Sequence, residues 1–106
     1  MGINTANGEE AEKTARLLSA LFGLELRPGK KAVFAGTYFE CMAGPGAGAN
    51  GHIGMAVDDV SAAVEELKAK GVTFREDSAG YDAEGNLRLI YLSDEIAGFA
   101  IHLVRK

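Results

Sequence analysis

The chain has 106 residues, of which 47% are hydrophobic and 25% charged, and these proportions are typical of one ordinary globular domain. Its formal net charge of -4 gives no electrostatic reason to bind nucleic acid or an anionic membrane, and we expect neither partner. No apolar run approaches the roughly 20 residues that span a bilayer, and no signal peptide opens the chain. Together with the single cysteine, Cys41, these features predict a cytoplasmic protein.

The first strong periodic signal is a helix. Between Asn7 and Gly23, apolar residues recur at helical spacing. Asn7 is suited to cap the start of this helix, and Gly23 to the left-handed conformation that ends it. Three short strands are predicted after the helix, over residues 24–27, 31–34 and 37–42.

The same order of elements is predicted again after a glycine-rich linker. Residues 52–57 alternate as a strand, and Asp59 and Gly71 bracket a second helix. Three strands follow, over residues 72–75, 87–92 and 99–104. The polar insert 76–86 separates the first two of them and is predicted to be a loop.

Each half therefore has the order strand, helix and three strands, and Glu40 aligns with His102 between the halves. We predict a single α+β domain, in which two βαβββ modules form a curved, mostly antiparallel sheet with a helix outside each. By the same alignment the counterpart of His52 precedes Met1, so the first strand is expected to be truncated. The predicted parts are module one over 1–43, a linker over 44–51 and module two over 52–106.

Three polar residues are predicted to share the concave face of this sheet. Side chains alternate across a strand, so when apolar residues such as Ile53 and Ile101 face the helices, Glu40, His52 and His102 face away from them. Two imidazoles and one carboxylate suit a divalent transition metal such as Zn, Ni, Mn or Fe. The same face could instead bind an anion or simply be solvated, because a strand histidine is usually only a hydrogen-bonded side chain.

The repeated pattern, and above all the stretch HIGMAVDDVSAAVEELKAKGVTF, resembles the vicinal oxygen chelate superfamily of glyoxalase I, extradiol dioxygenases and bleomycin-resistance proteins. The resemblance covers the whole chain. It implies that Glu40, His52 and His102 fall on three of the four metal positions, with His102 in place of the usual glutamate.

A narrower resemblance concerns an accessory domain. The stretches GINTANGEEAEKTARLLSALFG, FAGTYFECM, NGHIG and AEGNLRLIYLSDEIAGFAIHLVRK are similar to the C-terminal domain of some bacterial 2-dehydro-3-deoxyphosphogluconate/4-hydroxy-2-oxoglutarate aldolases. This resemblance implies a lyase parent of sugar-acid metabolism, an aldolase barrel as neighbour and a small 2-oxo acid or sugar acid as ligand. The Schiff-base lysine belongs to the barrel, which this chain is too short to contain, so no lysine here takes that role.

Two other functions remain open. One is a metal-dependent lyase or isomerase of the glyoxalase type, with Glu40 as metal ligand or base. The other is a metal-free binding protein similar to the bleomycin-resistance proteins. A homodimer is also expected, because a truncated first strand would leave a sheet edge exposed.

Overall fold

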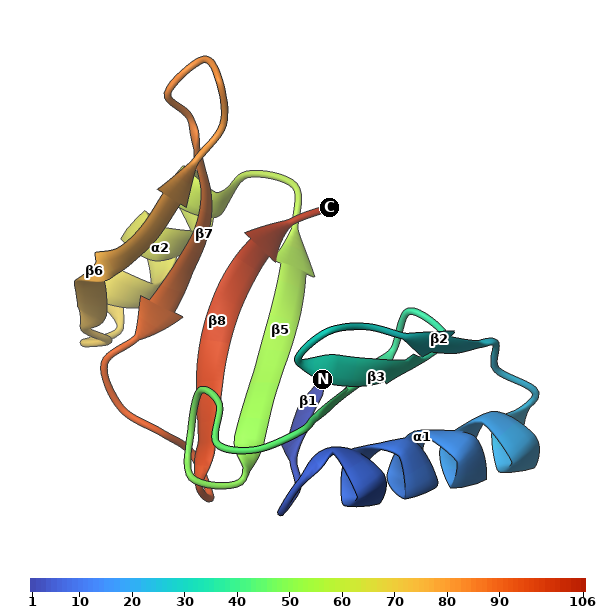
Figure 1. Ribbon diagram of the computed structural model, residues 1–106. Helices are drawn as coiled ribbons and strands as arrows, with labels where there is room; N and C mark the ends of the chain where they lie inside the picture. The colour runs from blue at the N-terminus through green and yellow to red at the C-terminus, as the bar shows by residue number, and fades with distance from the viewer. The chain divides into compact units, whose positions relative to one another are not determined.

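The chain folds into two helices and eight strands, in the order strand, helix and three strands, which occurs twice (Figure 1). The computed structural model describes all residues from Met1 to Lys106. Parallel and antiparallel strand pairs both occur, so the predicted α+β class is confirmed. The elements of the first half are β1 (Gly2–Asn4), α1 (Gly8–Phe22), β2 (Leu26–Pro28), β3 (Ala32–Ala35) and β4 (Phe39–Met42). Those of the second half are β5 (Gly51–Val57), α2 (Val60–Ala69), β6 (Phe74–Tyr81), β7 (Leu87–Leu92) and β8 (Phe99–Arg105).

Two compact units make up the chain, unit 1 over Met1–His52 and unit 2 over Ile53–Lys106. The boundary falls inside β5, so Gly51 and His52 belong to unit 1 and the rest of the strand belongs to unit 2. The strand begins at Gly51, one residue earlier than predicted and inside the expected linker. Neither helix combines the length and the apolar character that crossing a membrane requires.

Helix α1 begins and ends at the residues that the sequence predicts. The Asn7 side chain accepts a hydrogen bond from the Glu10 backbone N–H at 2.9 Å, which caps the helix start. Gly23 follows the last turn with φ of 66°, a left-handed conformation that glycine adopts at no steric cost. The small residues Ala11 and Ala15 are fully buried, so the helix can approach its strands closely.

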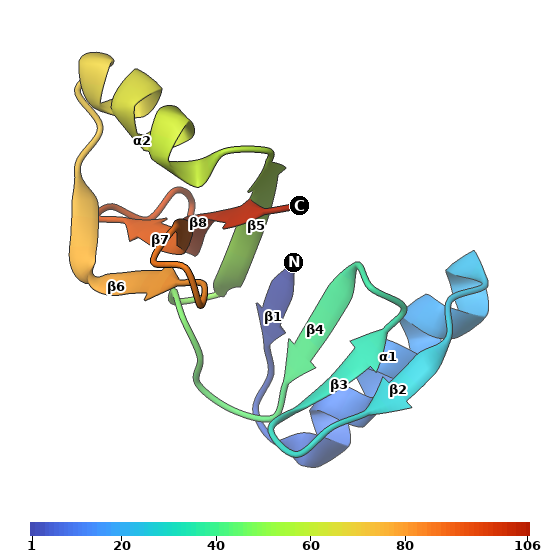
Figure 2. The ribbon, with the colours of Figure 1, turned by 90° about the horizontal axis from the view of Figure 1, so that it is seen from above.

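The strands of unit 1 lie in the order β2-β3-β4-β1, and the first residues of β5 pair with β1. Figure 2 shows α1 lying along one face of β2, β3 and β4. Cys41 on β4 is fully buried beneath this helix, and its burial raises the pKa of the thiol. Because β1 lies between β4 and β5, the short first strand is not an edge of unit 1. The exposed edge that suggested a homodimer is therefore absent at β1, and the dimer stays a prediction.

The strands of unit 2 lie in the order β5-β8-β7-β6. The Asp59 side chain caps α2 by accepting a hydrogen bond from the Ala62 N–H at 3.1 Å, as predicted. The helix packs chiefly on β7 and β8, where Leu103 is buried. Met55 alternates with Ile53 along β5 and was therefore also expected to face a helix, but it is 53% exposed because α2 packs on β7 and β8.

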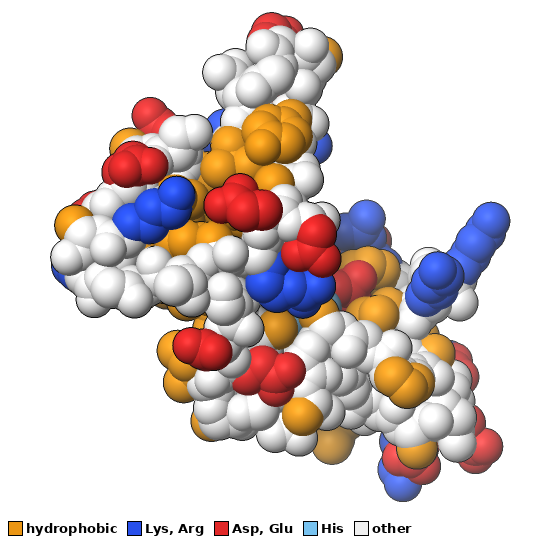
Figure 3. All heavy atoms as spheres, turned by 90° about the vertical axis from the view of Figure 1, so that its left-hand side faces the viewer, with side chains coloured by type: hydrophobic (Ala, Val, Ile, Leu, Met, Phe, Trp, Pro, Cys, Tyr) orange, Lys and Arg blue, Asp and Glu red, His pale blue; other side chains and the backbone are white.

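The insert between β6 and β7 is where the sequence prediction was wrong. Residues 76–81 were expected to form a loop, yet they continue β6 as far as Tyr81. The strand is irregular, with a register shift between Arg75 and Gly80. The Ser78 hydroxyl holds this bulge, since it donates to the Arg75 carbonyl at 2.6 Å and accepts from the Tyr91 N–H at 2.9 Å. On the side of the molecule shown in Figure 3, charged side chains of both signs border hydrophobic ones.

Asp82 anchors the turn between β6 and β7. Its carboxylate accepts hydrogen bonds from the Arg105 guanidinium at 2.7 Å, the Asn86 backbone N–H at 2.8 Å and the Glu84 backbone N–H at 3.0 Å. The Arg105 bond above all, and then the backbone bonds, hold the pKa of the Asp82 carboxyl well below its ordinary value. Asp82 therefore stabilises unit 2 only while it is ionised.

This lowered pKa predicts how stability depends on pH. A carboxyl whose pKa is lower in the folded state contributes its full stabilisation above the ordinary value of 3.8, and loses it as the pH falls towards the folded value. Asp82→Asn should therefore be less stable than the wild type in urea unfolding at pH 7, with a difference that shrinks below about pH 4. Asp77→Asn, at a carboxylate that is 77% exposed, is the control and should behave as wild type. Equal differences at pH 7 and pH 3 for Asp82→Asn would contradict the prediction.

Candidate functional site

Glu40, Gly2 and His52 lie side by side on three neighbouring strands of unit 1. Gly2 on β1 pairs with Glu40 on β4 on one side and with His52 on β5 on the other. Residues that are directly opposite on paired strands share a face of the sheet. Cys41, the next residue after Glu40, is in the core under α1, so Glu40 and its two neighbours occupy the face without a helix. The prediction that Glu40 and His52 face away from the helix is therefore confirmed.

The His52 imidazole reaches across Gly2 to Glu40. Strands are spaced about 4.8 Å apart, so side chains two strands apart meet only if the strand between them leaves room. Gly2 provides that room, because a Cβ atom built there would overlap the imidazole ring. The His52 Nε2 atom consequently lies 3.1 Å from the Glu40 Oε1 atom. A side chain at position 2 is incompatible with this contact.

The Glu40–His52 pair is partly buried rather than sealed. The His52 side chain is 14% exposed and the Glu40 side chain 35% exposed, so the carboxylate is the more accessible end. Phe34 lies directly opposite Glu40 on β3 and flanks the carboxylate on the same face. The pair thus offers the Glu40 carboxylate to solvent, with the His52 Nε2 atom directly behind it, an arrangement that can accept hydrogen bonds from a small ligand.

In unit 2, His102 shares one feature of this arrangement, a glycine on the neighbouring strand, and has an aromatic neighbour in place of a carboxylate. A Cβ atom at Gly54 would lie 2.8 Å from both Cε1 and Nε2 of His102, so this imidazole also lies over a glycine. On its other side the Tyr91 ring lies directly opposite on β7, with ring centroids 4.8 Å apart. Leu103 is in the core under α2, so His102 lies on the face without a helix. Glu40 and His102 therefore hold equivalent positions, as the sequence repeat predicts.

The aromatic neighbours were missed in the sequence. Phe34 and Tyr91 are the partners of Glu40 and His102 on the adjacent strands. Each occupies an alternate position in a predicted strand, on the parity that faces away from the helix. The pairing register was needed to find them, because alternation alone does not tell which residues of two strands lie opposite each other.

The predicted metal ligands form a pair in unit 1 and a single residue in unit 2. Glu40 and His52 are in contact, and His102 lies over Gly54. Within either unit, no three His, Cys, Asp or Glu side chains gather in a metal-binding arrangement. A zinc site takes three or four protein ligands, so the Glu40–His52 pair fits such a metal only in part. A metal held by Glu40, His52 and His102 remains a prediction.

These features define a class of site: a polar pair that lies over a glycine, on the helix-free face of an α+β module.

No protein-family model matches the chain, and no curated protein matches it. Among solved structures the chain is similar to the oxidase ChaP-H2, with 15% sequence identity and a TM-score of 0.34 over 100% of this chain and 90% of that one. A likeness at this level does not establish membership of a superfamily.

Proposed function

We propose that the chain is a glyoxalase-like binding module that takes a small ligand or a metal ion on the helix-free face of its strands. Its two βαβββ modules would form the curved, mostly antiparallel sheet of the vicinal oxygen chelate superfamily. We further propose that it serves as the C-terminal accessory domain of a 2-dehydro-3-deoxyphosphogluconate/4-hydroxy-2-oxoglutarate aldolase. The observation that supports a binding role best is the contact of His52 with Glu40 across Gly2.

The chemistry of the pair favours a small 2-oxo acid or sugar acid. The Glu40 carboxylate can accept from the hydroxyl groups of such a ligand, and a ligand carboxylate that displaces Glu40 can accept from the His52 Nε2–H in its place. Phe34 offers an apolar surface to the carbon chain. The contact with Glu40, for which Gly2 leaves room, restrains the imidazole before binding and so lowers the entropic cost of binding.

Two alternatives use the same residues. If a divalent metal is bound, Glu40, His52 and His102 would hold it, and the metal would supply Lewis-acid polarisation of neighbouring ligand oxygens. If none is bound, the module is a metal-free binding protein. Both alternatives use the Glu40–His52 pair, and binding measurements separate them.

Calorimetric titration of the full chain distinguishes these alternatives. Pyruvate, the smallest 2-oxo acid, is titrated into metal-stripped protein, and Zn²⁺, Ni²⁺, Mn²⁺ and Fe²⁺ are titrated separately. Loss of the imidazole donor should weaken pyruvate binding at least about tenfold in His52→Ala. Glu9→Gln, at an exposed glutamate on α1, is the control and should bind as wild type.

The same titrations test the metal. Tight metal binding that is lost in His52→Ala and in His102→Ala supports the metal-dependent alternative. Pyruvate binding that is unaffected by a chelator supports the metal-free one. If the wild type binds neither pyruvate nor any of the metals, or if the variants bind them unchanged, the proposed function is wrong.

A further inference from the structure

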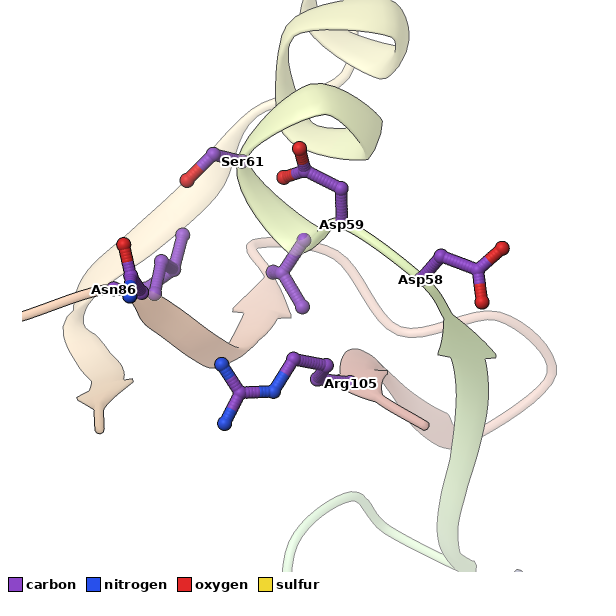
Figure 4. A pocket seen from close by; sticks show the side chains of 7 residues that line it. Asp58, Asp59, Ser61, Asn86 and Arg105 are labelled. Carbon is purple, nitrogen blue, oxygen red and sulfur yellow. The ribbon is translucent and has the colours of Figure 1, made fainter. Parts of the chain in front are cut away.

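A second candidate site lies in unit 2 on the α2 side of the strands. A pocket of about 320 Å³ lies where β8 ends, α2 begins and β7 starts. Figure 4 shows the side chains that line it. Arg105 and Leu103 share one face of β8, opposite the face of His102, so this pocket is separate from the proposed function. Its volume is at the lower end of the range for small-molecule sites, about 300 Å³ and above.

The pocket combines hydrogen-bond donors and acceptors. In Figure 4 the Arg105 guanidinium points into the space below Asn86, while Ser61 and Asp59 lie on the opposite side at the first turn of α2. Arg105 uses one N–H to donate to Asp82 at 2.7 Å, and a guanidinium has five. The Ser61 hydroxyl is exposed and can both donate and accept. A ligand that both donates and accepts hydrogen bonds matches this set.

The charges at the pocket disfavour a free anion. Arg105 neutralises Asp82, and Lys106 lies 3.6 Å from Asp58, which points away from the pocket in Figure 4. Asp59 has no cationic partner, although one of its oxygens caps α2. The balance is one excess carboxylate, so phosphate or another strong anion would be repelled. A hydroxyl group can instead donate to Asp59 and accept from Arg105.

The pocket also has an apolar part that can contact the C–H groups of such a ligand. Val60 and Leu87 line it between the polar groups. Val60 is 1% exposed, so its position is fixed by the core of unit 2. Leu87 is half-buried and is therefore the apolar surface that this mainly polar pocket offers to a ligand.

We propose that this pocket binds a small neutral polyhydroxy compound of monosaccharide size. Arg105 and Asn86 contact its hydroxyl groups from one side, and Ser61 and Asp59 contact them from the other. Leu87 packs against its C–H groups.

The test is an amide ¹H–¹⁵N titration of the full chain with D-glucose as the probe, and with inorganic phosphate and calcium chloride in separate arms. Glucose should cause saturable shifts at residues 60–61, 86–87 and 105, with a Kd on the order of millimolar. Arg105→Lys keeps the charge beside Asp82 but loses the planar fork, and should raise the Kd about fivefold. Ser61→Ala, at an exposed residue, should raise it by a similar factor.

Ser93→Ala is the matched control, because Ser93 is an exposed serine of unit 2 that does not line the pocket. It should bind glucose as the wild type does. Absence of saturable shifts with glucose overturns the proposal, as does an unchanged Kd in both pocket variants. Shifts of the same amides by phosphate or calcium but not by glucose overturn it in favour of an ion site.

Discussion

Gly2→Ala is expected to separate His52 from Glu40 and to abolish ligand binding at the pair. The added methyl group would overlap the imidazole, which has no other route across β1 to the carboxylate. Either the ring or the strand has to move, and overpacking of this kind typically costs about 1–3 kcal/mol of stability. The ¹⁵N chemical shifts of the His52 imidazole, which report its hydrogen bonding, should change with the substitution.

Gly44→Ala is the matched control for this experiment. Gly44 belongs to the same unit, and a Cβ atom there would meet nothing within 4 Å. Its ligand affinity and His52 signals should equal those of the wild type. If Gly2→Ala also leaves the imidazole signals and the unfolding free energy unchanged, the glycine is not what allows His52 to reach Glu40.

Leu103→Ala is expected to cause the largest loss of stability in unit 2. Leu103 is 4% exposed and packs with Val60, Val64 and Ile90. Truncating a buried leucine to alanine removes apolar contacts and leaves a cavity, at a cost of about 2–5 kcal/mol. For a chain of this size each kcal/mol lowers the Tm by roughly 4–8 °C. Thermal unfolding followed by circular dichroism measures the effect.

Leu17→Ala makes the same chemical change at a surface position. Leu17 on α1 is 59% exposed, so its truncation should alter the unfolding free energy by no more than about 0.5 kcal/mol. Comparable losses in the two variants would show that the cluster around Leu103 is not the stabilising core of unit 2.

The features that the sequence predicted well have local physical causes. Asn7 and Asp59 cap the helices because a side chain needs only its own neighbours to reach the first free N–H groups. Glu40 and His102 lie on the helix-free faces because alternation along a strand follows from backbone geometry. Both causes operate within a few residues, so a pattern in the chain is enough to predict them.

The features that were missed depend on contacts between distant residues. The continuation of β6 to Tyr81 is supported by β7, and its bulge removes the alternation that a sequence pattern would show. The role of Gly2 follows from a register that places it between Glu40 and His52. Met55 is exposed because α2 covers β7 and β8 instead. No local pattern contains these pairings.

The bulge in β6 affects how readily another chain can add to the outer strand of unit 2. A straight outermost strand offers a row of unpaired N–H and C=O groups to which another chain can add, which is a route to aggregation. In β6 the register shift interrupts that row, and the charged side chains Glu76 and Asp77 lie within the interruption. The Ser78 hydroxyl keeps the Tyr91 N–H satisfied while the backbone bends away. An interrupted outer strand is a poorer template for strand addition than a straight one, so the bulge lowers the tendency of β6 to pair with other chains.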